Sequence, residues 1–118
     1  MIRVFATREG RLGHVTASGY RVDAIVPFVA LPSVRALHRF IRILNPLSNQ
    51  ATYAVVLDVG PWNTNDDAYV FAGQHPQAES GTDERGRQTN RAGIDLSERV
   101  WHALGMLDNG AVDWEFLS

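Results

Sequence analysis

Short apolar runs separated by turn residues, with only one strongly helical stretch, limit the folds open to this chain. Residues 40–45, FIRILN, alternate apolar and polar side chains, and PLSNQ then supplies turn residues before residues 52–59 run back. This pattern predicts a β-hairpin. Residues 2–7 and 26–31 predict two further strands, and AVDWEFL at 111–117 predicts a last one.

One amphipathic helix is predicted near the carboxyl end. Its apolar side chains recur at the spacing of a single helical face: Val100, Ala103, Leu104 and Leu107. Ser97 is the expected N-cap, and Gly105 or Gly110 can end the helix. A further helical turn is expected within SVRALHR, capped by Ser33. Short strands with so little helix predict a closed or nearly closed β-barrel.

Residues 63–92 interrupt this pattern with a long polar segment, which we call the 63–92 excursion. It is dense in Asn, Asp, Gly, Gln and Thr and contains one short apolar island. Structureless segments of this length are uncommon inside compact domains and are usually functional or partly disordered. Because 118 residues suffice for one core, we expect a single domain over residues 1–118 with this excursion as an insertion.

Composition excludes several function classes. All 11 basic residues are arginine, so a P-loop lysine and a Schiff-base lysine are impossible. The absence of cysteine excludes disulfides, thiol catalysis and zinc-thiolate sites. A net charge of −2 argues against nucleic acid as a partner, and no apolar run is long enough to span a membrane. The start, MIRVFATREGRLG, has no secretion-signal pattern, and the compartment is left open.

Motifs for metals and serine chemistry are incomplete. Asn63, Asn65 and Asp67 match the first half of a calcium loop. Ala68 and Gln74 then stand where the glycine and the bidentate glutamate belong. The histidines lack metal-ligand spacing, and TASGY lacks the first glycine of a nucleophile elbow. We therefore expect neither a metal nor another cofactor.

The chain carries four segments in a fixed order: TASG at 16–19, VALP at 29–32, VVLDVGPW at 55–62 and GIDLSERVWHALGM at 93–106. Together they resemble the rare lipoprotein A family, which is related to three-aspartate domains and to membrane-bound lytic transglycosylase A. The resemblance implies a six-stranded double-psi β-barrel with one or two short helices. The sequence departs from the family at Phe28, near the place where many members carry a histidine.

The resemblance also implies site residues. Asp95 matches the acid/base aspartate of glycan-cleaving barrels, and Asp58 matches the neighbouring aspartate at a strand end. A partly desolvated acid can protonate a leaving oxygen while its neighbour stays ionised. We therefore expect cleavage of peptidoglycan glycan strands by lytic transglycosylation. Alternatively, Asp95 forms a helix capping box with Glu98, and Asp58 is a structural hydrogen-bonding group.

The 63–92 excursion is expected to build one wall of the substrate groove. Three aromatic side chains in it or directly before it would stack on sugar rings, with ordinary packing as the alternative: Trp62, Tyr69 and Phe71. For hydrolysis, a second carboxylate would come from Asp58 or from this set: Asp66, Asp67 and Glu79.

Two non-enzymatic functions stay open beside cleavage. One is a glycan-binding or structural module of a phage tail or cell-envelope assembly, with a protein partner there. The other is a protein-interaction domain. The family resemblance implies peptidoglycan or a related polysaccharide as the main partner, and action at the cell envelope, in the periplasm or from a phage particle.

Overall fold

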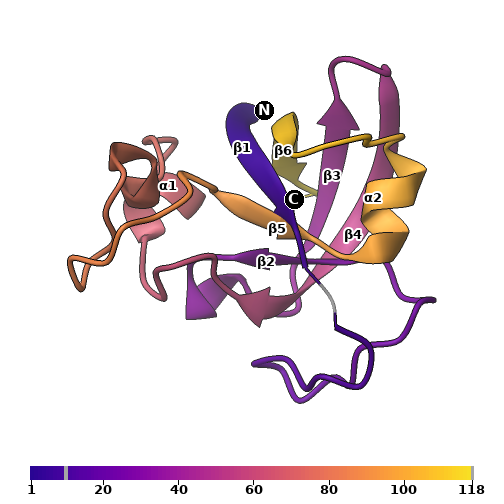
Figure 1. Cartoon of the computed structure of the whole chain (residues 1–118), viewed down its shortest axis with the longest axis horizontal. Coiled ribbons are helices and arrows are strands. Elements are labelled where there is room, and N and C mark those ends of the chain that lie inside the picture. Colours follow the sequence, from indigo (N-terminus) through magenta and orange to yellow (C-terminus); the bar gives the residue numbers. More distant parts are fainter. Residues whose placement is uncertain (10, 118) are drawn as a thin grey trace.

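Six strands close into a barrel in the computed structural model, which describes residues 1–9 and 11–117 (Figure 1). The strands are β1 (Ile2–Arg8), β2 (Phe28–Leu31), β3 (Phe40–Asn45), β4 (Gln50–Val59), β5 (Ile94–Leu96) and β6 (Gly110–Phe116). Their order around the barrel is β1-β5-β2-β4-β3-β6. The β1–β5 and β2–β4 pairs are parallel and the others antiparallel. The predicted fold class, a mainly β six-stranded barrel with short helices, is confirmed.

The helices are α1 (Asp67–Val70) and α2 (Glu98–Ala103), and 3-10 turns cover Val34–Ala36 and Gln77–Ser80. The Ser97 hydroxyl accepts the Val100 N–H at 3.4 Å, so the predicted N-cap of α2 is confirmed. Gly105, with φ of 63°, follows the helix and ends it. Within the described residues, no helix has the length and apolar character needed to cross a membrane.

The predicted hairpin is formed by β3 and β4, whose register runs from Phe40 opposite Val55 to Asn45 opposite Gln50. β4 therefore begins two residues before the predicted start. β2 begins at Phe28, later than predicted, because Pro27 has no N–H to donate to a strand ladder.

Alternate side chains of the strands fill the barrel interior. The buried cluster draws apolar residues from all six strands: Val4, Val29, Leu31, Ile41, Ile43, Val56, Ile94, Leu96, Val112 and Trp114. Because successive side chains of a strand point to opposite faces, the residues between these face outward. Thr7, Ala30 and Asp95 are such outward positions.

The 63–92 excursion lies to one side of the barrel, drawn from salmon to orange in Figure 1. Its main apolar anchor is Tyr69, which is buried and whose hydroxyl donates to the Gly93 carbonyl at 2.8 Å. That hydroxyl also accepts the Trp114 indole N–H at 2.9 Å. Elsewhere side chains bond to backbone, as where Asp83 accepts the N–H groups of Arg85 and Arg87. The excursion is thus a folded segment built largely from polar contacts.

Candidate functional site

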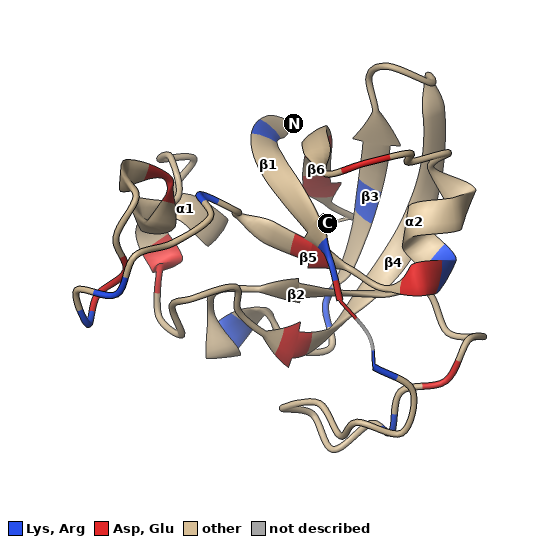
Figure 2. Ribbon diagram, viewed as in Figure 1, with Lys and Arg blue, Asp and Glu red and all other residues tan. Residues whose placement is uncertain are grey.

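The two predicted aspartates lie in one row across neighbouring strands. Thr7 on β1 is opposite Asp95 on β5, Asp95 is opposite Ala30 on β2, and Ala30 is opposite Asp58 on β4. Since neighbouring strands are about 4.8 Å apart, the backbones of Asp95 and Asp58 are separated by about 10 Å. Figure 2 shows the acidic positions on β5 and at the tip of β4, on either side of β2. Ala30, which lies between them in the row, is itself buried.

A register shift turns Asp58 toward this row. Val29 is opposite Val56, but the next residue, Ala30, is opposite Asp58 and not Leu57. In a regular strand Asp58 would point to the same face as the buried Val56. The extra residue at Leu57 reverses that alternation, and such irregularities commonly re-aim side chains beside functional sites.

Asp95 is partly buried and is bonded by the Thr7 hydroxyl, which donates to its Oδ1. Burial raises the pKa of Asp95 to about 6; the Thr7 bond opposes this rise and the charge of Asp58 adds to it. The capping alternative for Asp95 is wrong, because Ser97 caps α2 and Asp95 lies within β5. Asp95 is therefore an outward-facing acid whose pKa approaches neutrality.

Asp58 is held by two backbone amides. Its Oδ1 accepts the N–H groups of Ala17 and Val59, each at 2.9 Å. The Ser18 N–H also donates to the Leu57 carbonyl at 3.2 Å, which ties the TASG turn to the end of β4. Amide donors of this kind complement an ionised carboxylate. The structural alternative for Asp58 thus has direct geometric support.

Glu9 is a third carboxylate in the cluster, and sequence reasoning missed it. Its backbone N–H donates to the Leu96 carbonyl at 2.8 Å, which continues β1 along β5. Within the part of the chain that the structure describes, its buried Oε1 has no hydrogen-bond partner. Burial, together with the charges of Asp95 and Asp58, raises the pKa of Glu9 from 4.5 to about 8. Glu9 is two residues after Thr7 and so shares its face, a signal visible once the strand is extended.

An open cavity of about 540 Å³ adjoins Asp95. Its lining combines a carboxylate, amides, a hydroxyl, a guanidinium and an indole: Thr7, Arg8, Pro61, Trp62, Asn90, Asp95 and Asn109. The Trp62 Nε1–H donates to the Asn90 Oδ1 at 2.9 Å, which fixes the indole ring. Arg8 forms an ion pair with Glu98 at 2.6 Å. Such a wall of polar groups beside one aromatic ring suits a hydroxyl-rich ligand.

The other predicted binding residues do not gather here. Tyr69 is 1% exposed, so its ring has no free face for a sugar. Phe71 stacks on Phe116 at 5.4 Å between ring centroids, on another face of the barrel. For these two rings the structure favours ordinary packing over sugar stacking, because Tyr69 anchors the excursion and Phe71 is stacked on Phe116.

The acidic residues of the excursion also have structural partners. Asp66 is buried and its Oδ2 accepts the Gln77 N–H at 2.8 Å. Asp67 accepts the Ser33 hydroxyl and pairs with Arg35 at 3.0 Å. Glu79 lines a different cavity. Hydrolysis with a second carboxylate from this set has no geometric support at Asp95. In the described residues, no three His, Cys, Asp or Glu side chains form a group suited to a metal ion.

A family model described as a domain of unknown function, DUF8814, matches residues 1–115. The chain belongs to the DUF8814 family. No curated protein matches its sequence. This DUF8814 barrel is similar to the crystal structure of cerato-platanin 3 from M. perniciosa, with a TM-score of 0.58 and 10% identity. That alignment covers 99% of this chain and 95% of the other, and at such low identity the likeness concerns the fold alone. Membership of the rare lipoprotein A family stays a prediction.

Proposed function

We propose that this DUF8814 barrel binds a cell-wall glycan strand, of peptidoglycan or a related polysaccharide, in the cavity beside Asp95. The observation that carries the proposal is the pairing of Trp62 with Asn90 opposite a carboxylate on a rigid strand. A flat indole suits the face of a pyranose, and carboxylate and amide groups suit its hydroxyls. The order of the TASG, VALP, DVGPW and IDLS segments supports the same ligand class. The 63–92 excursion then serves as an insertion of the same domain that supplies part of the wall.

Binding is tested by co-sedimentation with insoluble peptidoglycan. Wild-type protein should sediment with the polymer, and Trp62→Ala should weaken the association about tenfold because the ring contributes the main apolar contact. Tyr53→Ala is the matched control, since Tyr53 is 61% exposed on β4 and does not line the cavity. Failure of the wild type to sediment would reject glycan binding and favour a protein-interaction role, with an envelope or phage-tail protein as the partner.

Glycan cleavage by lytic transglycosylation is the second candidate, and the raised pKa of Asp95, about 6, favours it. Protonated Asp95 would give its proton to the bridging oxygen as the C1–O bond breaks. The oxocarbenium-like centre would then be closed by the muramic acid 6-hydroxyl, whose proton returns to Asp95. Asp58, held by amides beside it, would supply negative charge toward that centre. The reaction needs no water molecule and no second carboxylate from the excursion.

Product analysis separates the two candidates. A transglycosylase would release anhydro-muropeptides, and Asp95→Asn would abolish them while co-sedimentation persisted. The rate should also fall as the pH rises above about 6, because the acid form of Asp95 is then lost. Binding with no products from wild-type protein at any pH would leave the non-catalytic glycan-binding module.

A further inference from the structure

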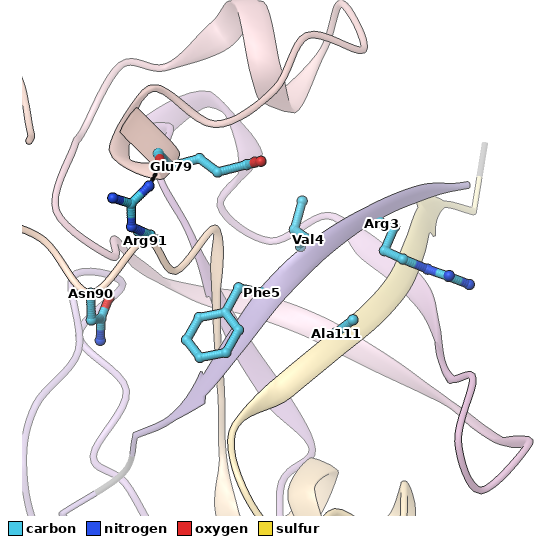
Figure 3. A pocket seen from close by; sticks show the side chains of 7 residues that line it. All are labelled: Arg3, Val4, Phe5, Glu79, Asn90, Arg91 and Ala111. Atoms are coloured by element: carbon cyan, nitrogen blue, oxygen red, sulfur yellow. Dashed lines mark hydrogen bonds between the residues drawn. The ribbon is translucent and has the colours of Figure 1, made fainter. Parts of the chain in front are cut away.

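A second cavity, of about 440 Å³, lies beside the first. Its lining residues come from β1, β6 and the 63–92 excursion: Arg3, Val4, Phe5, Glu79, Asn90, Arg91 and Ala111 (Figure 3). Asn90 lines both cavities. We infer that the two cavities form one groove, in which Phe5 stacks on a distal sugar ring and Arg91 binds a carboxylate carried by the glycan. This inference rests on the proposed glycan binding and adds a subsite and a substrate class to it.

Phe5 is placed as a platform. The residue is 37% exposed, and Figure 3 shows its ring standing off β1 toward the segment that carries Asn90 and Arg91. The residue opposite Phe5 on β6 is Ala111, whose methyl group is too small to cover the ring. A single exposed aromatic residue is ordinary on a protein surface. Phe5 differs because it stands on a paired strand inside a cavity that continues the first one, and strands hold a binding group more rigidly than loops do.

Arg91 supplies a positive charge that no carboxylate neutralises among the described residues. Its Nη1 donates to the Glu79 carbonyl at 2.9 Å, which positions the guanidinium and leaves its charge intact. Arg3 in the same cavity is instead paired with Asp113 at 2.8 Å. Guanidinium groups bind carboxylates through two parallel N–H bonds, so Arg91 suits an acidic substituent.

The acidic residue in this cavity does not oppose that role. The Glu79 carboxylate lies 3.4 Å from the His75 ring. Figure 3 shows the Glu79 side chain directed toward Val4, away from the Arg91 guanidinium. The groove therefore has carboxylates at Asp95 and Glu79, and a guanidinium at Arg91 that forms an ion pair with neither of them among the described residues. A neutral sugar at the first position and a carboxylate-bearing sugar at the second fit this arrangement.

Isothermal titration calorimetry tests the inference with ligands that differ in length and in charge. The probes are peptide-free peptidoglycan glycan strands, whose alternate sugars carry a lactyl carboxylate, and neutral chitin oligomers of equal length. Wild-type protein should bind longer strands more tightly than short ones, and should prefer the acidic strands. Phe5→Ala should weaken binding of long strands about three- to tenfold and leave the shortest ligands unaffected.

Arg91→Gln should abolish the preference for acidic over neutral strands, and Arg91→Lys should retain part of it because the charge remains. Phe40→Ala and Arg99→Gln are matched controls, since both residues are exposed and lie on β3 and α2. Ala111→Leu is a second route to the same result, because a larger side chain would cover the Phe5 ring without removing it. Thermal unfolding checks that each variant is folded.

The outcomes are distinguishable. Short glycans that bind at the first cavity, together with unchanged affinity of long strands for the Phe5→Ala and Ala111→Leu variants, would reject the distal subsite and leave the proposed function standing. Equal affinity for acidic and neutral strands in the wild type would reject the role of Arg91. Absence of any glycan binding by the wild type would reject the proposed function and the distal subsite together.

Discussion

The barrel and the 63–92 excursion are stabilised in different ways. The barrel is closed by strand ladders and filled by a continuous apolar cluster. The excursion is fixed mainly by side chains that bond to backbone, with Tyr69 as its buried anchor. Asp58 and Asp95 stand on barrel strands, whereas Asn90 and Glu79 come from the excursion. The proposed chemistry is therefore carried by barrel strands, and recognition is shared with a segment that we expect to open locally before the barrel unfolds.

The largest effect is expected from the barrel core. Trp114 is 2% exposed and packs edge-on against Tyr69 and Phe116. Trp114→Ala should lower the free energy of unfolding by about 3–5 kcal/mol, because it leaves a large cavity. Chemical denaturation measures this, with Leu107→Ala, at a side chain that is 99% exposed, as the control. A loss below about 1 kcal/mol would contradict the assignment of Trp114 to the core.

The second largest effect is expected at the junction between the barrel and the excursion. Tyr69→Phe removes the hydroxyl that bonds the Gly93 carbonyl and the Trp114 indole N–H, and leaves both groups buried without it. We expect a loss of about 2–3 kcal/mol in the free energy of unfolding. Tyr53→Phe, at an exposed tyrosine on β4, should have no effect. Equal stability of the two variants would show that Tyr69 does not anchor the excursion.

The carboxylate cluster should make stability depend on pH. The pKa of Glu9 is raised from 4.5 to about 8, so between these values the folded state holds a proton that the unfolded state has lost. Unfolding then releases a proton, and stability falls as the pH rises through this window.

Thermal unfolding at pH 5 and pH 8 should therefore show a drop in Tm that Glu9→Gln reduces by on the order of 4 °C. The exposed Glu115→Gln serves as the control. If the Tm of Glu9→Gln depended on pH as strongly as the wild-type Tm does, the titration of Glu9 would not be the source of the pH dependence.

The smallest global effect is expected from the polar core of the excursion. Asp83 is buried and accepts the N–H groups of Arg85 and Arg87 as well as the Arg87 Nε–H. Asp83→Ala should speed proteolytic cleavage within residues 63–92 several-fold, while amide exchange in the barrel strands stays as slow as in the wild type. Glu84→Ala, in the same turn, is the matched control. Loss of barrel protection in Asp83→Ala would show that the two regions unfold together.

Local patterns sufficed to predict the hairpin and the Ser33 and Ser97 caps, since each depends on residues close in sequence. Barrel closure depends on distant pairs such as β1 with β5, and the six strands were implied by the family resemblance. The family resemblance, and no local pattern, implied that Asp58 and Asp95 lie near one another. The register shift at Leu57 was not predictable, because nothing in VVLDV distinguishes a regular strand from one with an extra residue. Tyr69 was misjudged for a similar reason: its burial depends on Gly93 and Trp114, which are far along the chain. Glu9 was missed because the predicted strand ended at Thr7, whereas β1 continues to Arg8 and the Glu9 N–H still bonds to β5.

The central claim, that a glycan strand lies in the cavity beside Asp95, is tested most directly by NMR on ¹⁵N-labelled protein titrated with peptide-free peptidoglycan strands. The account predicts shifts of the Trp62 indole N–H and the Asn90 side-chain amide, together with the backbone amide of Asp95, all saturating at one ligand concentration. Saturable shifts confined to other faces, with these three signals unmoved, would contradict it.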